Sequence, residues 1–219
     1  MLVVFTAIVI VFCSVFVCSA ETDTIDSGSC GTGATWYITG TETDMTLTIC
    51  GSGKVTKATW EQYNDCIKKV IVENGITEIG EGVFAGCSNL TDITIPFVGE
   101  KLQPNGMGTV FGYIFGRNAY SGGVKTLQRY ILGSGNNTTD TYSYFYIPST
   151  LTNVTITQGE IRKYVFMGCS GLTNINYPSG LTRIGDFAFS GCKSLSSVTI
   201  PKSLTAIGLD AFEGCSVSA

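Results

Sequence analysis

The chain has 219 residues, a formal net charge of −4 and no histidine, and only 14% of its residues are charged. The absence of histidine excludes histidine zinc sites and catalytic pairs in which serine or cysteine needs an imidazole. The acidic balance, with no basic patch evident in the sequence, argues against nucleic acid as a partner.

The N-terminus has the pattern of an export signal. Residues 2–17 are a nearly unbroken apolar run, and Cys18 and Ala20 place small residues at the −3 and −1 positions of a secretory cleavage site. The run carries no Lys or Arg, and an uncleaved membrane anchor is the alternative, although a full span needs about 20 apolar residues. We expect residues 1–20 to be a signal peptide, cleaved after Ala20, and the protein to be secreted or held at the cell surface.

Export would place the remaining cysteines in an oxidising compartment, where disulfides can form. An odd number of cysteines leaves at least one thiol unpaired. Seven cysteines follow the expected cleavage site: Cys30, Cys50, Cys66, Cys87, Cys169, Cys192 and Cys215.

Residues 21–62 form the first predicted unit, an N-terminal β cap. Polar and apolar residues alternate over 36–40 and 45–50, and glycines border both runs, which indicates a β-hairpin. Cys30 and Cys50 flank the hairpin, so we expect a disulfide between them. The cap would cover apolar side chains at the open end of a repeat stack.

A repeat organises the rest of the chain. Residues 181–192 and 204–215 carry nearly the same sequence at an offset of 23, which falls in the range of leucine-rich repeats. Such units bury their apolar face only by stacking on one another. The repeats are assigned to residues 63–96 and 147–219. Short Leu-x-x-Ile-x-Ile strands are predicted at 67–72, 90–95, 151–156, 172–177 and 195–200, with a looser sixth at 127–132.

Each repeat also contains a phenylalanine three residues before a cysteine. That spacing is one helical turn, so the ring should tuck beneath the sheet. The cysteines recur as a column: Cys87, Cys169, Cys192 and Cys215. Parallel side chains on stacked coils suit a disulfide poorly, so we expect buried thiols that pack as small apolar groups, and no metal site.

The pattern Leu-Thr-x-Ile-Gly-x-x-Ala-Phe-x-Gly-Cys-x-x-Leu-x-x-Val-x-Ile-Pro, taken from residues 181–201, resembles the BspA-type leucine-rich repeats of surface and secreted proteins. The match is strong at 76–96 and 161–215. The resemblance implies a β-rich, right-handed solenoid of short parallel strands and single helical turns, with a role in adhesion or ligand binding. It supplies no catalytic motif and no cofactor.

Residues 97–146 break the period and form an irregular insertion rich in glycine and aromatic residues. Insertions in repeat proteins leave from one face and often carry the binding surface. The candidate contact residues are Tyr120, Tyr142 and Tyr144, because tyrosine is a rigid amphipathic contact residue. The alternative, that aromatic residues fill the core of an irregular coil, is favoured for Phe111, Ile114 and Phe115.

Four asparagines lie in Asn-x-Ser/Thr acceptor sequences, which matter only in a eukaryotic secretory pathway. They are Asn89, Asn136, Asn137 and Asn153.

The function favoured by these patterns is an exported, non-catalytic binding or adhesion module whose ligand is an extracellular protein or glycan. A surface-coat or spacer protein is the main alternative. A secreted hydrolase is a weaker one, because the acidic residues occur on predicted turns without an evident paired carboxylate. The sequence stops shortly after Cys215 with no polar cap, which predicts that the last coil is exposed, that the chain is a fragment of a longer repeat protein, or that it self-associates end to end through the last repeat.

Overall fold

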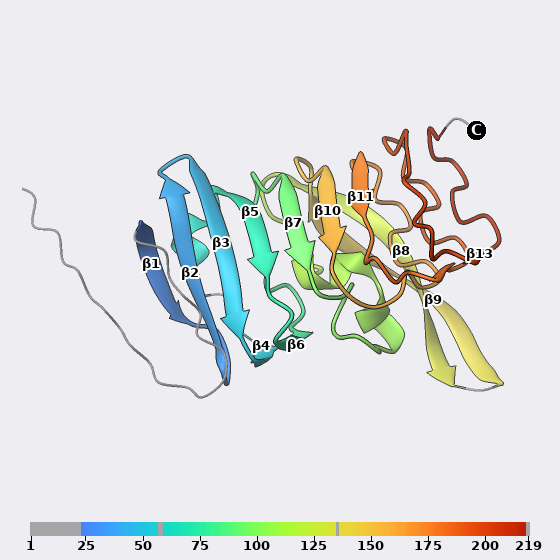
Figure 1. Cartoon of the computed structure of the whole chain (residues 1–219), viewed down its shortest axis with the longest axis horizontal. Coiled ribbons are helices and arrows are strands. Elements are labelled where there is room, and N and C mark those ends of the chain that lie inside the picture. Colours follow the sequence, from blue (N-terminus) through green and yellow to red (C-terminus); the bar gives the residue numbers. More distant parts are fainter. Residues whose placement is uncertain (1–22, 57–58, 135, 218–219) are drawn as a thin grey trace, which may run out of the picture.

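The structure, a computed structural model, describes residues 23–56, 59–134 and 136–217. The expected signal peptide and its cleavage site lie outside the described residues. The strands follow one another along the long axis of the molecule, from β1 at one end to β13 at the other (Figure 1). In the described ranges, no helix is long and apolar enough to cross a membrane.

One sheet runs along most of the stack, in the order β1-β2-β3-β5-β7-β10-β11. Its first three strands are antiparallel: β1 (Thr24–Ser29), β2 (Ala34–Thr41) and β3 (Asp44–Gly51). The remaining strands are parallel, one from each successive coil: β5 (Ile67–Val72), β7 (Asp92–Ile95), β10 (Asn153–Ile156) and β11 (Asn174–Asn176). The predicted solenoid of short parallel strands is confirmed.

Four of the described coils then turn and add a second short strand. These form two further parallel pairs: β4 (Gly53–Val55) with β6 (Ile76–Ile79), and β12 (Arg183–Ile184) with β13 (Ala206–Ile207). The predicted strand at 195–200 is wrong. Leu195 is buried as expected, but Ile200 is 49% exposed and the segment does not pair with β11.

The register of the parallel strands brings the repeated apolar residues together in one buried core. Val70 pairs with Ile93, Ile93 with Val154, and Val154 with Ile175, so equivalent residues of successive coils stack in a column. All four are buried. Because alternate strand residues point to opposite faces, one apolar position in two is enough to fill this column. Each coil therefore covers the apolar face of the coil before it.

The segments that end in Gly-Cys form tight turns rather than helix. The N–H of Cys192 donates to the Phe189 carbonyl at 3.0 Å, which closes a single i to i+3 turn. Neighbouring turns are joined by backbone hydrogen bonds, such as Phe166 N–H to Ala188 O and Phe189 N–H to Ala211 O, both 2.8 Å. The predicted burial of Phe166 and Phe189 is confirmed. The single helical turn predicted there is instead a hydrogen-bonded turn whose backbone groups bond to the next coil.

The rings under these turns form an aromatic row that runs through the stack. Trp36 contacts Trp60 at 5.9 Å between centroids, and Phe166, Phe189 and Phe212 stack nearly parallel at 5.3 Å spacings. Between these ends the row continues through Trp60, Phe84, Phe115, Phe111 and Phe166. Phe111, Ile114 and Phe115 are completely buried, so the predicted core role of these residues is confirmed.

The insertion behaves as one enlarged coil. It contains the 3₁₀ helices η2 (Gly106–Thr109) and η3 (Phe111–Phe115) and the hairpin β8 (Gly123–Ser134) and β9 (Asn137–Pro148). η3 accepts from the Phe84 N–H and donates to Val165 O, both at 2.9 Å, and so replaces a repeat turn. Strands β7 and β10 remain paired across the gap. Residues 127–132 do lie in a strand, but this strand is part of β8 and pairs with β9, so its assignment as a repeat strand is wrong.

The predicted Cys30–Cys50 disulfide is not formed, because Cys30 has a free, buried thiol. The Cys30 N–H donates to the Ala34 carbonyl at 3.1 Å, whereas Cys50 pairs with Thr35 across the β2–β3 ladder. Ala34 and Thr35 are successive strand residues and point to opposite faces. The two cysteines thus lie on opposite faces of the sheet. The capping role of the antiparallel strands stays a prediction.

The cysteine column consists of free thiols, as expected. Cys87, Cys169 and Cys192 are buried, and Cys215 on the last coil is half-buried. The Cys192 thiol donates to Phe166 O at 3.2 Å, and the Cys215 thiol donates to Phe189 O at 3.1 Å. Burial raises the pKa of Cys87 to about 12, so this thiol stays protonated at neutral pH.

Candidate binding surface

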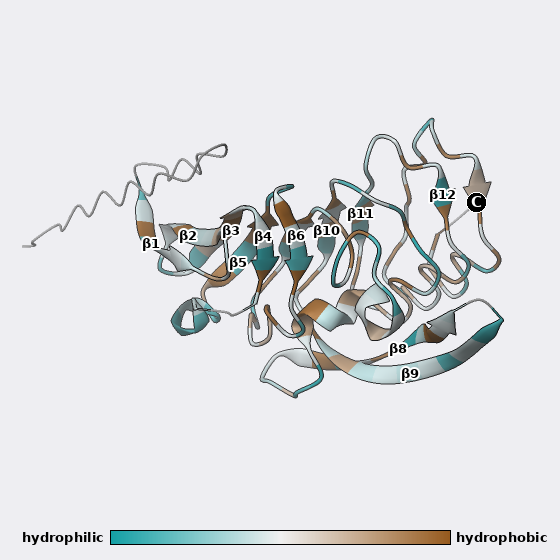
Figure 2. Cartoon of the chain, turned by 90° about the horizontal axis from the view of Figure 1, so that it is seen from below, coloured by the Kyte–Doolittle hydropathy of each residue, from teal (hydrophilic) through white to brown (hydrophobic). Residues whose placement is uncertain are grey.

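The hairpin β8–β9 runs lengthwise beneath the coils that follow it (Figure 2). Its strands pair in one register, with Leu127 opposite Tyr144 and Arg129 opposite Tyr142. Alternate residues face the repeats or solvent. Thr126, Tyr130 and Phe145 belong to the inner face and are buried.

The Gln128 side chain links this inner face to the repeats through hydrogen bonds. The side chain is completely buried, and its Oε1 accepts from the Gly112 N–H of η3 at 2.6 Å. Its Nε2 donates to the Met167 carbonyl at 3.1 Å. One amide therefore joins η3, the hairpin and the turn before Cys169. Sequence reasoning did not single out Gln128, because its partners are distant in the chain.

The outer face of the hairpin presents large side chains to solvent. Leu127 is 40% exposed, and Tyr142 and Tyr144 are each 49% exposed. The two tyrosines are two residues apart on β9 and so share a face. Exposed aromatic and apolar side chains gathered in this way mark interaction surfaces more often than isolated ones do.

Two cations lie against these rings. The Lys125 Nζ is 4.1 Å from the centroid of the Tyr144 ring, and the Arg129 guanidinium carbon is 5.7 Å from that of Tyr142. Both distances are within the range of a cation–π contact. We call the set Lys125, Leu127, Arg129, Tyr142 and Tyr144 the hairpin face.

Tyr120 does not belong to the hairpin face. Its hydroxyl donates to the Tyr146 carbonyl at 2.7 Å, and its ring packs beside Gly123 at the base of the hairpin. Burial raises the pKa of Tyr120 above its usual value. The structure thus places Tyr142 and Tyr144 on one exposed face, whereas Tyr120 packs at the base of the hairpin.

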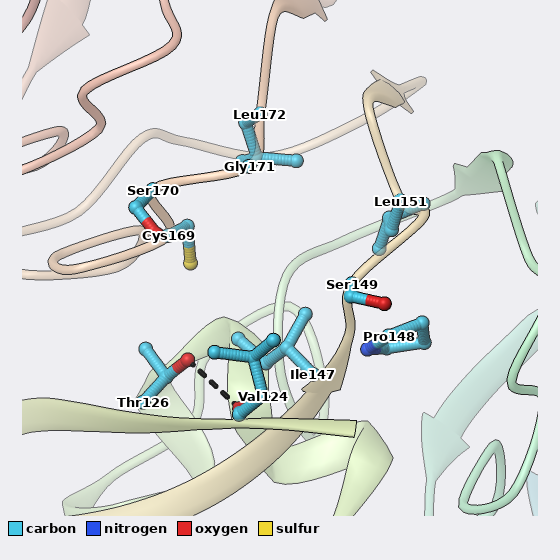
Figure 3. Close-up of a pocket in the computed structure, with 10 residues that line it drawn as sticks. All are labelled: Val124, Thr126, Ile147, Pro148, Ser149, Leu151, Cys169, Ser170, Gly171 and Leu172. Atoms are coloured by element: carbon cyan, nitrogen blue, oxygen red, sulfur yellow. Dashed lines mark hydrogen bonds between the residues drawn. The ribbon is translucent and has the colours of Figure 1, made fainter. Parts of the chain in front are cut away.

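A small pocket lies where the hairpin base meets the following coils (Figure 3). Its cavity volume is about 140 Å³, and its apolar lining includes Val124, Ile147, Leu151 and Leu172. No charged side chain lines it. Drug-sized ligands occupy sites of about 300 Å³ or more, so this pocket suits nothing larger than a small apolar group.

Within the described ranges, no group of three or more Cys, Asp or Glu side chains could hold a metal ion.

The four acceptor asparagines differ in accessibility. Asn136 and Asn137 are exposed at the hairpin tip. The Asn89 side chain donates to the Asp65 carbonyl at 2.8 Å, and that of Asn153 donates to the Thr152 hydroxyl at 3.2 Å. A glycan would therefore be accommodated most readily at the hairpin tip.

Residues 55–106 and 159–219 match the family model of the BspA type leucine rich repeat region, in six copies. The match leaves out residues 1–54, which include strands β1 to β3, and residues 107–158, which include the hairpin. No curated protein matches the chain.

Solved structures of leucine-rich repeat proteins are similar to the chain. One from Eubacterium ventriosum is 16% identical, with 89% of this chain and 96% of that chain covered and a TM-score of 0.29. A leucine rich cell surface protein from Faecalibacterium prausnitzii is 18% identical, with 90% and 54% covered and a TM-score of 0.37. One from Bacteroides ovatus is 25% identical, with 68% and 35% covered and a TM-score of 0.38. The chain thus spans about half or less of the length of the last two.

Proposed function

Because the chain belongs to the BspA-type leucine-rich repeat family, we propose that it is an exported, non-catalytic binding and adhesion module. Its partner is an extracellular protein or glycan, which it engages through the hairpin face. The single observation that carries this proposal is the exposure of Tyr142 and Tyr144 on a hairpin whose opposite face buries Tyr130 and Phe145.

The hairpin face suits binding better than the solvent face of the long sheet. The sheet's strands β7, β10 and β11 present small polar residues such as Thr94 and Thr155, and Asn176 there already donates to the Thr155 hydroxyl at 3.1 Å. Small groups bonded to one another offer little area to a partner. Tyrosine offers a large, rigid, amphipathic surface at low conformational-entropy cost.

Export is supported by the apolar run and small residues of positions 1–20. N-terminal sequencing of the protein recovered from the medium or cell surface tests this part of the proposal. A mature chain that begins at Glu21 would support it, and full-length protein retained inside the cell would contradict it.

Replacing both exposed tyrosines, Tyr142→Ser with Tyr144→Ser, should abolish binding to an extracellular-matrix and glycan panel. The free energy of unfolding should change by no more than about 0.5 kcal/mol per site, because neither ring is part of the core. Tyr37→Ser, a half-buried tyrosine on β2, is the matched control and should leave binding intact. If the double variant still binds the panel, the hairpin face is not the binding surface, and this part of the proposal is contradicted. If the wild-type protein bound no member of the panel, the spacer alternative would gain support.

End-to-end self-association is the second proposal for a partner. The last described coil exposes Ile207 (52%) and Leu209 (66%), and burial of such side chains favours association. Changing both to Ser should shift the protein towards monomer in sedimentation equilibrium. A wild-type protein that is monomeric at every concentration would contradict the proposal.

A further inference from the structure

Basic side chains that are scattered in the sequence gather beside the hairpin. Arg162, Lys163 and Arg183 line a groove of about 290 Å³, together with Glu160 and Asp186. Three cations against two carboxylates leave the groove net positive, although the chain as a whole carries a net charge of −4. We call Arg162, Lys163 and Arg183 the basic groove.

Tyr164 connects the basic groove to the hairpin face. The Lys163 Nζ lies 4.8 Å from the centroid of the Tyr164 ring, and the Arg129 guanidinium carbon of the hairpin lies 4.5 Å from it. The Tyr164 ring is itself buried, but its contacts with Lys163 and Arg129 place the basic groove beside the hairpin face, where Arg129 also contacts Tyr142.

The ion pairs inside the groove are loose. Arg162 is 3.9 Å from Glu160, Lys163 is 4.0 Å from Asp186, and Arg183 is 3.8 Å from Asp186. These separations exceed hydrogen-bond length. One Asp186 oxygen also accepts from the Leu209 N–H at 3.1 Å. The three cations therefore keep donors that an incoming anion can use, and pairs of this exposure contribute little to stability.

We infer that the basic groove and the adjoining hairpin face form a binding site for an anionic polysaccharide that bears carboxylate or sulfate groups. This inference rests on the proposed function and names the chemistry of the ligand. Guanidinium groups bind carboxylate and sulfate oxygens through paired hydrogen bonds, and tyrosine rings and hydroxyls contact sugar rings and their hydroxyl groups.

The shape of the surface favours a polysaccharide over an acidic polypeptide. The groove is open rather than enclosed and adjoins the hairpin face, so a polymer could contact both without entering a closed pocket. Ile161, the one large apolar side chain among the residues that line the groove, is buried, so the groove itself lacks the exposed apolar anchor that protein partners use as a hot spot.

The test uses the purified protein and four immobilised polymers: heparin, polygalacturonate, neutral dextran and polyglutamate. Heparin or polygalacturonate should bind, more weakly as salt is raised, because anion binding is screened and releases counterions. Lys163→Gln with Arg183→Gln should weaken that binding by about tenfold or more, since each charged hydrogen bond accounts for about that factor. The control Lys69→Gln with Lys202→Gln removes the same charge from exposed sites elsewhere and should have little effect.

The outcomes separate this inference from the proposed function. Lack of binding to both anionic polysaccharides overturns the inference, as does equal loss in the control variant or equal binding of dextran. Stronger binding of polyglutamate assigns the surface to acidic polypeptides and also overturns it. The tyrosine double variant could keep polysaccharide binding while the Lys163 and Arg183 variant loses it. That result would support the basic groove as the binding site and contradict the proposal that the hairpin face binds the ligand.

Discussion

Phe189→Ala should lower the free energy of unfolding by about 3–5 kcal/mol, the usual cost of truncating a fully buried phenylalanine. The Phe189 ring has no exposed surface and lies between Phe166 and Phe212, with both centroids 5.3 Å away. Removing it leaves a cavity that two coils line, and stacked coils cannot close such a cavity without breaking the hydrogen bonds between their turns.

Phe212→Ala is the matched control, because Phe212 occupies the same repeat position on the last coil. Its ring is only half-buried and stacks on Phe189 alone. Urea unfolding followed by circular dichroism should show a clearly smaller loss for Phe212→Ala. If both variants lost the same free energy of unfolding, the covering of a ring by the next coil would not determine how much that ring contributes to stability.

Gln128→Ala should cost about 3 kcal/mol and should loosen the hairpin. The change leaves the Gly112 N–H and the Met167 carbonyl without their partner in a buried place, and each unpaired buried group costs about 1–3 kcal/mol. The cost should exceed that of a simple cavity, because the backbone groups on either side cannot bond to each other.

Urea unfolding combined with limited proteolysis measures both effects. Cleavage within β8–β9 should become faster in Gln128→Ala. Ser143→Ala is the control on the same hairpin: its hydroxyl meets that of Tyr130 at 3.1 Å but remains half-exposed, so the change should stay within about 0.5 kcal/mol. Hairpin cleavage that stays as slow as in the wild-type protein would show that Gln128 does not hold the hairpin.

The repeats were predictable because the residues that define each repeat lie close together in the sequence. A 23-residue period with alternating apolar residues determines which side chains face inward, and Leu181, Ile184 and Phe189 are buried as the pattern indicates. The same period failed at 195–200, where the apolar pattern is present but the segment does not pair with β11. A strand forms only where a neighbouring backbone supplies hydrogen bonds, and side-chain periodicity carries no information about that neighbour.

The binding surfaces were only partly predictable. Tyr142 and Tyr144 were selected for their residue type, and so was Tyr120, whose hydroxyl is in fact committed to the Tyr146 carbonyl. The basic groove is not evident in the sequence, because Arg183 lies on the coil after the one that carries Arg162 and Lys163, and the overall charge is acidic. Only the stacking of coils brings these three side chains together.

The sequence by itself determined the family, the repeat unit, the buried face of each coil and the core role of Phe111 and Phe115. These follow from short-range spacing, which holds whatever the rest of the chain does. The tertiary structure alone decided that Cys30 and Cys50 lie on opposite faces, that the insertion closes into one enlarged coil, and that Gln128 joins it to the repeats. Those outcomes depend on register and on contacts between distant residues, and a one-residue shift in register would reverse the faces.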